Sequence, residues 1–399
     1  MTPARAALLA ALLGICTPAF AQSPGHAAPP ALQSAIATYR AGDLATAEAE
    51  LRRLAAGNAD AEAWLGAVLI DRDRGSEGLQ ALSQALAAGS PEAAHQLGLV
   101  YAQGLAGVAR DDARAAQLFE KAAATGHYRA ALNLGVLYFR GQGVPHDLVQ
   151  ARAWLEKAAS SNDPYALYAL GRAFEESQGA VVADPVRAAD LYRRAAEQGL
   201  PLAALRYGLA LADGLGVKAD AAAAQKWLLA AQKDGVPEAA LALGDMTART
   251  LSPRDKAANR KILATAAAWY RQAADAGVPS AQFKLANAYA AGSGVGRDLG
   301  QATAWYGRAA RQGLPEAQLA LGVLLLGGAV GTADPVEGYK WLLLAERGGR
   351  TEAHMVQEKV SGQISPADRS RAEELAATFS PKAERSASDV PPRLSRPPR

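Results

Sequence analysis

The sequence predicts an all-α fold, a right-handed α-solenoid of stacked antiparallel helix pairs, because two residue markers recur at a fixed period. The first marker is a small residue that follows Leu or Tyr in an alanine-rich segment, at intervals of 36 or 37 residues with one of 42: Gly98, Gly135, Gly171, Gly208, Gly244, Ala286 and Gly322. The second is Trp or Leu, followed eight residues later by Gly or Asn: Trp154, Leu191, Trp227, Trp269, Trp305 and Trp341. Units of this length stack because each has an apolar face that it cannot bury alone.

Residues 1–21 are typical of a secretory signal peptide. Arg5 is followed by an apolar run over residues 6–15 and by Ala19-Phe20-Ala21, a small-x-small cleavage site. The apolar run is too short to span a bilayer. We therefore expect cleavage after Ala21 and a periplasmic or secreted mature chain without an integral membrane segment.

Cys16, the only cysteine, lies inside this signal segment. Leu13 stands three positions before it, as in a lipoprotein signal, but Ile15 occupies a position where such signals have a small residue. The sequence therefore favours cleavage after Ala21 over lipid anchoring at Cys16. The mature chain would then contain no cysteine, which excludes disulfides, thiol catalysis and thiolate metal sites.

The net charge of +3 and the pI near 8.9 do not indicate nucleic-acid binding once the charges are placed. Arg5 leaves with the signal, and the tail from Ser380 carries five basic and two acidic residues. The body, residues 22–379, therefore has a net charge of about −1, which argues against a groove for a polyanion and favours a protein partner.

The chain divides into a short N-terminal region, a repeat array and a C-terminal region. Residues 22–60 contain a linker and a helix pair with Tyr39, Gly42-Asp43, Ala47 and Leu51. Residues 61–350 hold eight units, of which the first is degenerate and the sixth is extended. Residues 351–379 predict C-terminal capping helices, with Ser365-Pro366 before an amphipathic run, and the Pro/Arg-rich residues 380–399 predict a disordered tail.

Each unit carries signals for the ends of its two helices. Proline opens the first helix, where the missing amide costs no hydrogen bond: Pro91, Pro164, Pro201, Pro237, Pro279 and Pro315. A glycine-containing turn such as Gly141–Val144 follows. Aspartate then caps the second helix: Asp147, Asp184, Asp298 and Asp334. The Gly or Asn eight residues after the second marker ends that helix.

The recurring glycine of the first helix predicts close packing between helices. A glycine inside a helix costs about 1 kcal/mol relative to alanine, so its recurrence requires a compensating contact. We expect two helix backbones to approach closely there, with the Trp or Leu of the second marker buried between neighbouring units.

The pattern A-x-x-x-L-G-x-x-Y, G-x-G-V, D, A-x-x-W-x-x-K-A-A-x-x-G resembles the Sel1-like repeat (SLR), a relative of the tetratricopeptide repeat (TPR). It runs from Ala131 to Asn162 and again from Ala281 to Gly313, and the resemblance covers residues 61–350. Ala286 and Asn162 depart from the pattern by replacing glycine. Residues 35–56 are similar to a TPR helix pair.

No arrangement of residues indicates catalysis, so we do not expect an enzyme. The five histidines lie in a linker and in different units, and no pair has metal-binding helical spacing. We therefore expect surface or turn histidines and no metal site. Nucleophile-elbow and Walker motifs are absent. The glycine-rich turn Gly292–Gly296 follows a helix rather than a strand, which argues against a dinucleotide or other cofactor.

The positions that the repeat leaves free predict a protein-binding surface. Positions −2, +1 and +5 from the recurring glycine share one helical face, and they are variable and mostly polar. First helices usually line the concave side of stacked helix pairs, so this stripe is a candidate partner surface, with an ordinary solvated face as the alternative. Its main members are Gln96, Gln103, Asn133, Arg140, Arg172, Arg206, Asp245, Lys284 and Asn287.

A second candidate surface is the six-residue excess of the sixth unit, within residues 247–261. Insertions in repeat arrays often lie at binding faces, although an elongated loop or a helix extension explains the excess as well. Its basic residues are Arg249, Arg254, Lys256, Arg260 and Lys261.

The resemblance implies a periplasmic or secreted scaffold or adaptor that organises an envelope complex, such as exopolysaccharide export or a sensor-kinase pathway. One alternative is a β-lactam-binding or β-lactam-hydrolysing enzyme like cysteine-rich SLR relatives, but those have a cysteine pair in each repeat. A carbohydrate-binding solenoid is another alternative, which the packing position of most of the tryptophans disfavours.

Overall fold

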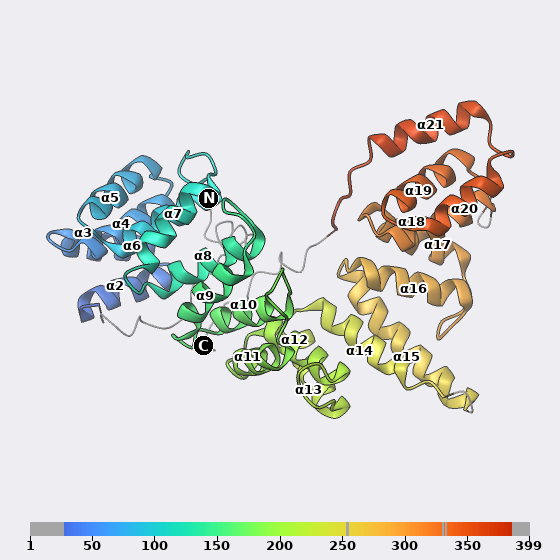
Figure 1. The fold of residues 1–399 in the computed structure, drawn as a ribbon, viewed down its shortest axis with the longest axis horizontal. Helices are drawn as coiled ribbons and strands as arrows, with labels where there is room; N and C mark the ends of the chain where they lie inside the picture. The colour runs from blue at the N-terminus through green and yellow to red at the C-terminus, as the bar shows by residue number, and fades with distance from the viewer. Residues whose placement is uncertain (1–27, 253–254, 329–330, 332, 385–399) are drawn as a thin grey trace. The chain divides into compact units, whose positions relative to one another are not determined.

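The computed structural model of the chain describes residues 28–252, 255–328, 331 and 333–384. Within them the elements are helices, apart from an isolated bridge between Gln178 and Val181. The described residues divide into two compact units, residues 28–219 and residues 220–384. The prediction of an all-α solenoid is confirmed (Figure 1). The predicted signal peptide, with Cys16, and residues 385–399 lie outside the described residues.

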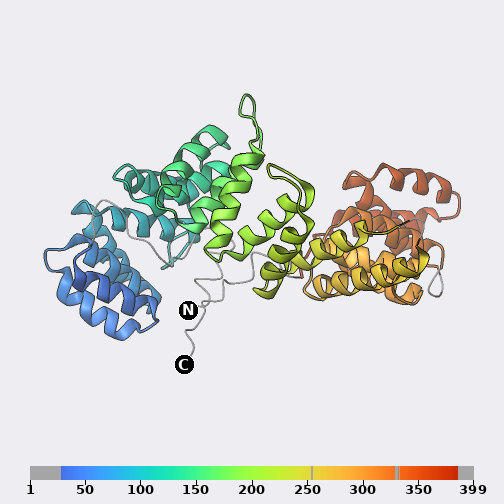
Figure 2. The same cartoon turned by 90° about the horizontal axis from the view of Figure 1, so that it is seen from below.

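The first compact unit is a series of antiparallel helix pairs. A turn joins the two helices of most pairs. Its helices are α2 (Pro30–Arg40), α3 (Leu44–Ala55), α4 (Ala59–Asp71), α5 (Gly75–Ala87), α6 (Pro91–Gln103), α7 (Asp112–Ala123), α8 (Tyr128–Arg140), α9 (Leu148–Ala159), α10 (Pro164–Glu175), α11 (Pro185–Glu197) and α12 (Pro201–Asp213). The longer turn between α10 and α11, drawn in green, projects from these helices as a hairpin (Figure 2).

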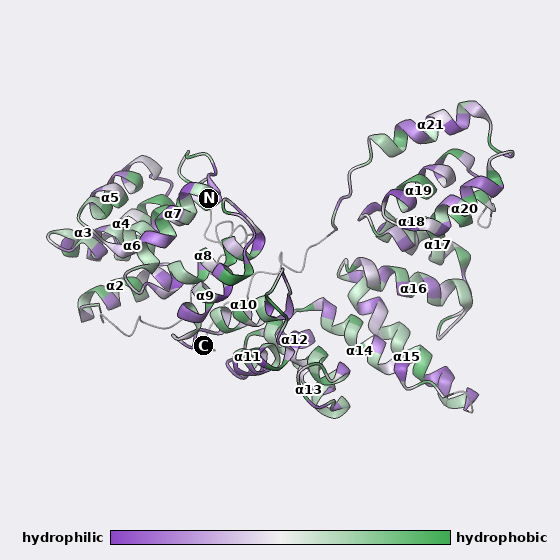
Figure 3. Cartoon of the chain, in the orientation of Figure 1, coloured by the Kyte–Doolittle hydropathy of each residue, from purple (hydrophilic) through white to green (hydrophobic). Residues whose placement is uncertain are grey.

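The second unit continues the same alternation. Its helices are α13 (Ala221–Lys233), α14 (Pro237–Arg249), α15 (Lys256–Asp275), α16 (Pro279–Ala291), α17 (Leu299–Arg311), α18 (Pro315–Leu326), α19 (Pro335–Arg347), α20 (Thr351–Val360) and α21 (Pro366–Ala377). Along most helices in both units, hydrophobic residues alternate with hydrophilic ones (Figure 3), and the buried positions are mainly Ala and Leu. The small alanine side chains allow the helices to pack closely, and the leucine side chains fill the space between them.

The helices begin and end at the residues that the sequence predicts. The six prolines that open first helices occupy the first or second helical position. Asp147, Asp184, Asp298 and Asp334 each accept a hydrogen bond from a backbone amide of the helix that they cap. Asn162 has a φ of 58°, so it takes the left-handed conformation that glycine has at this position in the other units.

The recurring glycine contacts the residue that follows the second marker, rather than the marker itself. A Cβ at Gly135 would lie 2.6 Å from Cγ of Leu155, and one at Gly171 would lie 2.6 Å from Cε1 of Tyr192. Trp341 and Leu191 are buried, whereas Trp154, Trp227, Trp269 and Trp305 are only half-buried. Full burial of the marker is therefore not found in most units, because the next residue points toward the recurring glycine of the same unit, but Trp269 and Trp305 still pack against cores that join neighbouring units.

A second glycine contact joins consecutive units. A Cβ at Gly143 would collide with the backbone of Asp112 and Ala113 at the start of α7, and one at Gly294 would collide with the backbone of Leu263 in α15. The glycine-containing turn of one unit thus lies directly on the second helix of the preceding unit. This contact fixes where α7 and α15 lie against the turn of the following unit.

Helix α15 contains the predicted excess of the sixth unit. It has 20 residues, whereas α17 and α19 have 13 each. Since the turn at Gly294 contacts α15 at Leu263, the residues from Lys256 to Ile262 extend the helix beyond the position where other second helices begin. The excess is therefore mostly a helix extension, capped by Asp255, whose side chain accepts hydrogen bonds from the amides of Ala257 and Ala258.

Residues 380–384, which we call the C-terminal strap, lie along α17 without forming a helix. The Lys382 amide donates to the Arg311 carbonyl at 2.9 Å, and the Glu384 amide donates to Oε1 of Gln312 at 3.1 Å. The Glu384 carboxylate accepts from Arg308 Nε at 2.9 Å and from Gln282 Nε2 at 2.8 Å. Disorder was expected from residue 380 onward, and it does not hold for the strap because these bonds fix it.

Candidate functional site

In the first compact unit, residues 28–219, the predicted stripe lies on the first helices of successive pairs, but the side chains of its members differ in solvent exposure. Gln96 and Gln103 are half-buried on α6, and Gln96 Nε2 donates to Oε1 of Glu92 at 2.7 Å. Asn133 on α8 is only 2 % exposed. A side chain buried to this degree cannot contact a partner, so the expectation of a partner-binding role is wrong for Asn133.

Three arginines of the stripe form a row on α8, α10 and α12. Arg140 is exposed at the end of α8. Arg172 Nε lies 3.3 Å from a carboxylate oxygen of Glu175, and Arg206 Nη1 lies 3.9 Å from the same oxygen. Arg140, Arg172 and Arg206, which we call the arginine row, thus follow one another on three first helices, and two of them share one carboxylate.

An aromatic ring lies under the arginine row. The Arg172 guanidinium is 5.8 Å from the centroid of the Phe139 ring. Behind it, Tyr168 packs on Tyr192 with ring centroids 5.7 Å apart. The face thus combines cationic and aromatic side chains, the composition that dominates binding energy at protein interfaces.

In the second compact unit, residues 220–384, hydrogen bonds link the stripe residues to other side chains. Asp245 accepts hydrogen bonds from the Tyr270 hydroxyl at 2.9 Å and from Lys284 Nζ at 2.5 Å. Asn287 is exposed and accepts from the Tyr306 hydroxyl at 2.5 Å. The polar side chains of this part of the stripe therefore link neighbouring helices, which leaves less of their hydrogen-bonding capacity for a partner.

The basic residues of the sixth unit are exposed where the structure describes them. Lys256, Arg260 and Lys261 lie on the extension of α15, and Arg249 lies at the end of α14. Arg254 lies outside the described residues. The structure therefore places four of the five predicted residues at one end of the α14–α15 pair, and of these Arg249, five positions after Gly244, also belongs to the stripe.

A cluster of titratable side chains that sequence reasoning missed lies on α6 and at the start of α8, in contact with the stripe residues Gln96 and Asn133. His95 is 4 % exposed and contacts Glu92 and His127, so the expectation of surface or turn histidines is wrong for it. Burial lowers the pKa of His95 to about 4. Burial alone would raise the pKa of Glu92, but contacts with His127 and His95 hold it well below its ordinary value. Ligand atoms of all three residues lie within 4.8 Å of one another, close enough to hold a metal ion.

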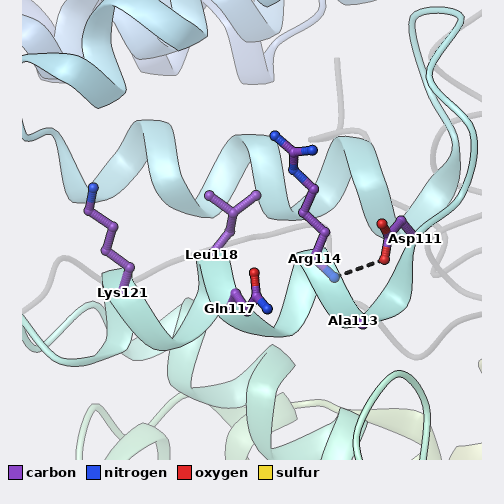
Figure 4. Close-up of a pocket in the computed structure, with 6 residues that line it drawn as sticks. All are labelled: Asp111, Ala113, Arg114, Gln117, Leu118 and Lys121. Carbon is purple, nitrogen blue, oxygen red and sulfur yellow. Dashed lines mark hydrogen bonds between the residues drawn. The ribbon is translucent and has the colours of Figure 1, made fainter.

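Figure 4 shows a surface depression along α7. Asp111, which caps the helix, lines it together with Ala113, Arg114, Gln117, Leu118 and Lys121. All of these side chains come from one helix and its cap, and Arg114 lies over the ring of Tyr101 at 4.5 Å. Groups from a single helix face do not converge on a bound small molecule as those of an enclosed pocket do.

Among the described residues, each helix is either too short or too polar to cross a lipid bilayer.

Two solved structures resemble the chain over most of its length. A protective antigen of uropathogenic Escherichia coli strains, which has an SLR fold, is 28 % identical with a TM-score of 0.67, and the match covers 88 % of this chain and 75 % of the antigen. A Sel1 repeat protein from Oxalobacter formigenes is 29 % identical with a TM-score of 0.61, and the match covers 87 % of this chain and 99 % of that protein.

A curated relative matches a shorter stretch. An ERAD-associated E3 ubiquitin-protein ligase component of Arabidopsis thaliana, HRD3B, is 36 % identical over 109 residues. The match covers 27 % of this chain and only 17 % of that relative. The similarity is therefore confined to a small part of a much larger protein.

The model of the Sel1 repeat family matches seven segments of the chain, residues 91–127, 129–163, 164–200, 201–235, 260–278, 279–314 and 315–349. They begin at α6, so the helix pair α4–α5, where a degenerate unit is expected, lies before the first match. Sel1 repeats generally mediate protein–protein interactions. Because the matches cover more than half of its residues, the chain belongs to the Sel1 repeat family.

Proposed function

We propose that this chain is a protein-binding scaffold or adaptor of the bacterial envelope and that its arginine row binds an acidic segment of a partner. The observation that carries the proposal is the alignment of Arg140, Arg172 and Arg206 on three successive first helices. Glu175 is the carboxylate that the structure pairs with both Arg172 and Arg206, so these two guanidinium groups share one acidic side chain.

The chemistry of the row fits a carboxylate-rich partner. A guanidinium group can donate two parallel hydrogen bonds to a carboxylate, and successive helices repeat this donor at the spacing of the solenoid. The Phe139 ring adds apolar area beside these charges. Such contacts favour an acidic peptide segment that also presents an apolar side chain.

Membership in a complex is consistent with the curated relative, which is a component of a ubiquitin-ligase assembly. The location in the envelope rests on the predicted signal peptide. Exopolysaccharide export and sensor-kinase pathways, which the family resemblance suggests, are the first complexes in which to seek the partner.

Site-specific photo-crosslinking tests the binding proposal. A photoreactive residue at position 140 should capture a partner in the native host, which mass spectrometry then identifies. The double variant Arg172→Glu/Arg206→Glu should lose this product because charge reversal adds repulsion toward an acidic segment. The matched control Arg53→Glu/Lys121→Glu reverses exposed charges on the second helices α3 and α7 of the same unit and should retain it. Equal capture by both variants would exclude the arginine row as the interface.

Fractionation tests the location separately. We expect the mature protein in the soluble periplasmic or secreted fraction, with Gln22 as its first residue. Incorporation of a palmitate analogue at Cys16 would show an anchored protein instead.

A further inference from the structure

The cluster of Glu92, His95 and His127 departs from the repeat pattern. Glu92 and His95 lie one turn apart on α6, and His127 is the N-cap residue of α8. The position of His95, three before the recurring small residue, is hydrophobic in the other units: Leu132, Tyr168, Leu205, Leu241, Phe283 and Leu319. A buried imidazole at an otherwise hydrophobic position is costly unless it has polar partners.

The three side chains are arranged as the ligands of a small ion are. Oε1 of Glu92 lies 3.6 Å from Nδ1 of His95, and Oε2 of Glu92 lies 3.3 Å from Nε2 of His127. Tetrahedral ligands at the usual zinc bond length are separated by about 3.3 Å. The distances from the two imidazole nitrogens to the Glu92 carboxylate, each to a different oxygen, are therefore close to those between ligands of a tetrahedral site.

Unpaired polar atoms mark the same place. Nδ1 of His95, which points toward Glu92, and Oδ1 of Asn133 are buried and have no hydrogen-bond partner. Asn133 Nδ2 lies 3.3 Å from the other ring nitrogen of His95. If the amide is turned over, its oxygen accepts a hydrogen bond from the Nε2–H group of His95, and Nδ1 then presents a lone pair toward the cluster.

We propose that Glu92, His95 and His127 bind a divalent first-row transition metal ion, for which Zn²⁺ is the best fit. Two imidazole nitrogens and one carboxylate oxygen are a donor set that Zn²⁺ favours, and they leave a fourth position for water or for a side chain of a partner. Gln96, which donates to Glu92, and Asn133 orient the ligands from behind. This proposal does not depend on the arginine row.

Metal binding requires a change of tautomer at His127. Nδ1 of this ring accepts a hydrogen bond from the Ala130 amide at 3.2 Å, so the proton of the neutral ring is on Nε2, facing Glu92. For the ion to bind Nε2, this proton must move to Nδ1, and the hydrogen bond from Ala130 is lost. Arg40 and Arg129 lie near enough to repel a cation. We therefore expect an affinity weaker than that of a structural zinc site.

Zinc titration of the untagged chain at pH 7.5, in competition with a chromophoric chelator, tests the site. The wild type should bind one Zn²⁺ ion. His95→Leu restores the hydrophobic residue of other units, and His127→Ser restores the serine that caps α6 at Ser90, so both variants should fold. Each should weaken binding at least tenfold. His354→Gln, which alters an exposed histidine between Glu346 and Glu358, should not.

Hydrogen exchange gives a readout specific to this site. The Ala130 amide should exchange faster in the zinc-loaded protein than in the metal-free protein, because the ion removes its acceptor. Absence of saturable binding by the wild type would overturn the proposal. So would binding that persists in His95→Leu and His127→Ser, or an Ala130 amide that zinc leaves unchanged.

Discussion

Glycine has two distinct roles at the scale of single residues. Gly143 and Gly199 both have positive φ, at 68° and 85°, but only the turn glycine Gly143 lies against the backbone of another helix. At Gly199 no atom lies within 4 Å of the position that a Cβ would occupy. Substitution of the two residues therefore separates the cost of the backbone conformation from the cost of the contact between units.

We predict that Gly199→Ala lowers the free energy of unfolding by about 1–2 kcal/mol, the cost of a left-handed conformation for a residue with a Cβ. Gly143→Ala should lower it by about 1–3 kcal/mol more, because the added methyl group forces the turn away from α7. Urea denaturation of both variants measures the difference. Equal losses would show that the turn does not lie on α7 as described.

Asp71 gives a prediction for the dependence of stability on pH. Its carboxylate accepts a hydrogen bond from the Tyr39 hydroxyl at 2.6 Å, and burial raises its pKa. A raised pKa means that the folded state takes up the proton before the unfolded state, so the wild type is stabilised as the pH falls through that pKa. Asp71→Asn removes the buried charge and keeps an oxygen acceptor. It should therefore increase stability at pH 7 and lose this advantage near pH 4, as thermal unfolding at the two pH values would show. An equal change at both values would contradict the assignment.

At the scale of elements, the sequence predicted most helix ends and less of the packing between helices. Prolines and aspartates act on the nearest backbone amides, so a local pattern is sufficient to place them. The direction of a side chain on the second helix depends on how two helices cross. For that reason Leu155, next to the marker Trp154, fills the space beside Gly135.

The same limit applies to the candidate site. The repeat pattern identified the arginine row because its members occupy positions −2, +1 and +5 from the recurring glycine. The distance between His95 and His127, in contrast, depends on how α6 and α8 stack. The signal that could have found the cluster was the histidine at a position that is hydrophobic in the other units.

The extension of α15 permits a prediction about a single element. Asp255→Ala removes the N-cap, which typically costs about 1 kcal/mol of local helix stability. The residues before Leu263 extend beyond the contact with Gly294, so we expect faster amide exchange in residues 257–262 and little change in residues 263–275. Hydrogen exchange with residue-level resolution measures this. Faster exchange throughout α15 would show that the extension stabilises the whole helix.

At the scale of the whole molecule, stability in a stack of repeats depends mainly on neighbouring contacts. Leu155 is fully buried in the first unit, and Leu155→Ala should cost about 2–5 kcal/mol. Protection of amides should fall in α8, α9 and α10, the helices nearest to the substitution, and should be preserved in α16–α19. Trp154→Ala, at a half-buried neighbour, should cost less and serves as the comparison. Uniform loss of protection along the chain would indicate that the molecule unfolds as one cooperative body.

The C-terminal strap affects the order in which the protein can be assembled during synthesis. Early helix pairs can stack on one another as they emerge, because each needs only its neighbour. Gln282 Nε2, however, donates a hydrogen bond to the carboxylate of Glu384, a residue 102 positions later in the chain. The part of the α16–α17 surface that the strap covers therefore remains open until residue 384 has been synthesised. A chaperone that binds newly made chains has its longest opportunity to act at this surface.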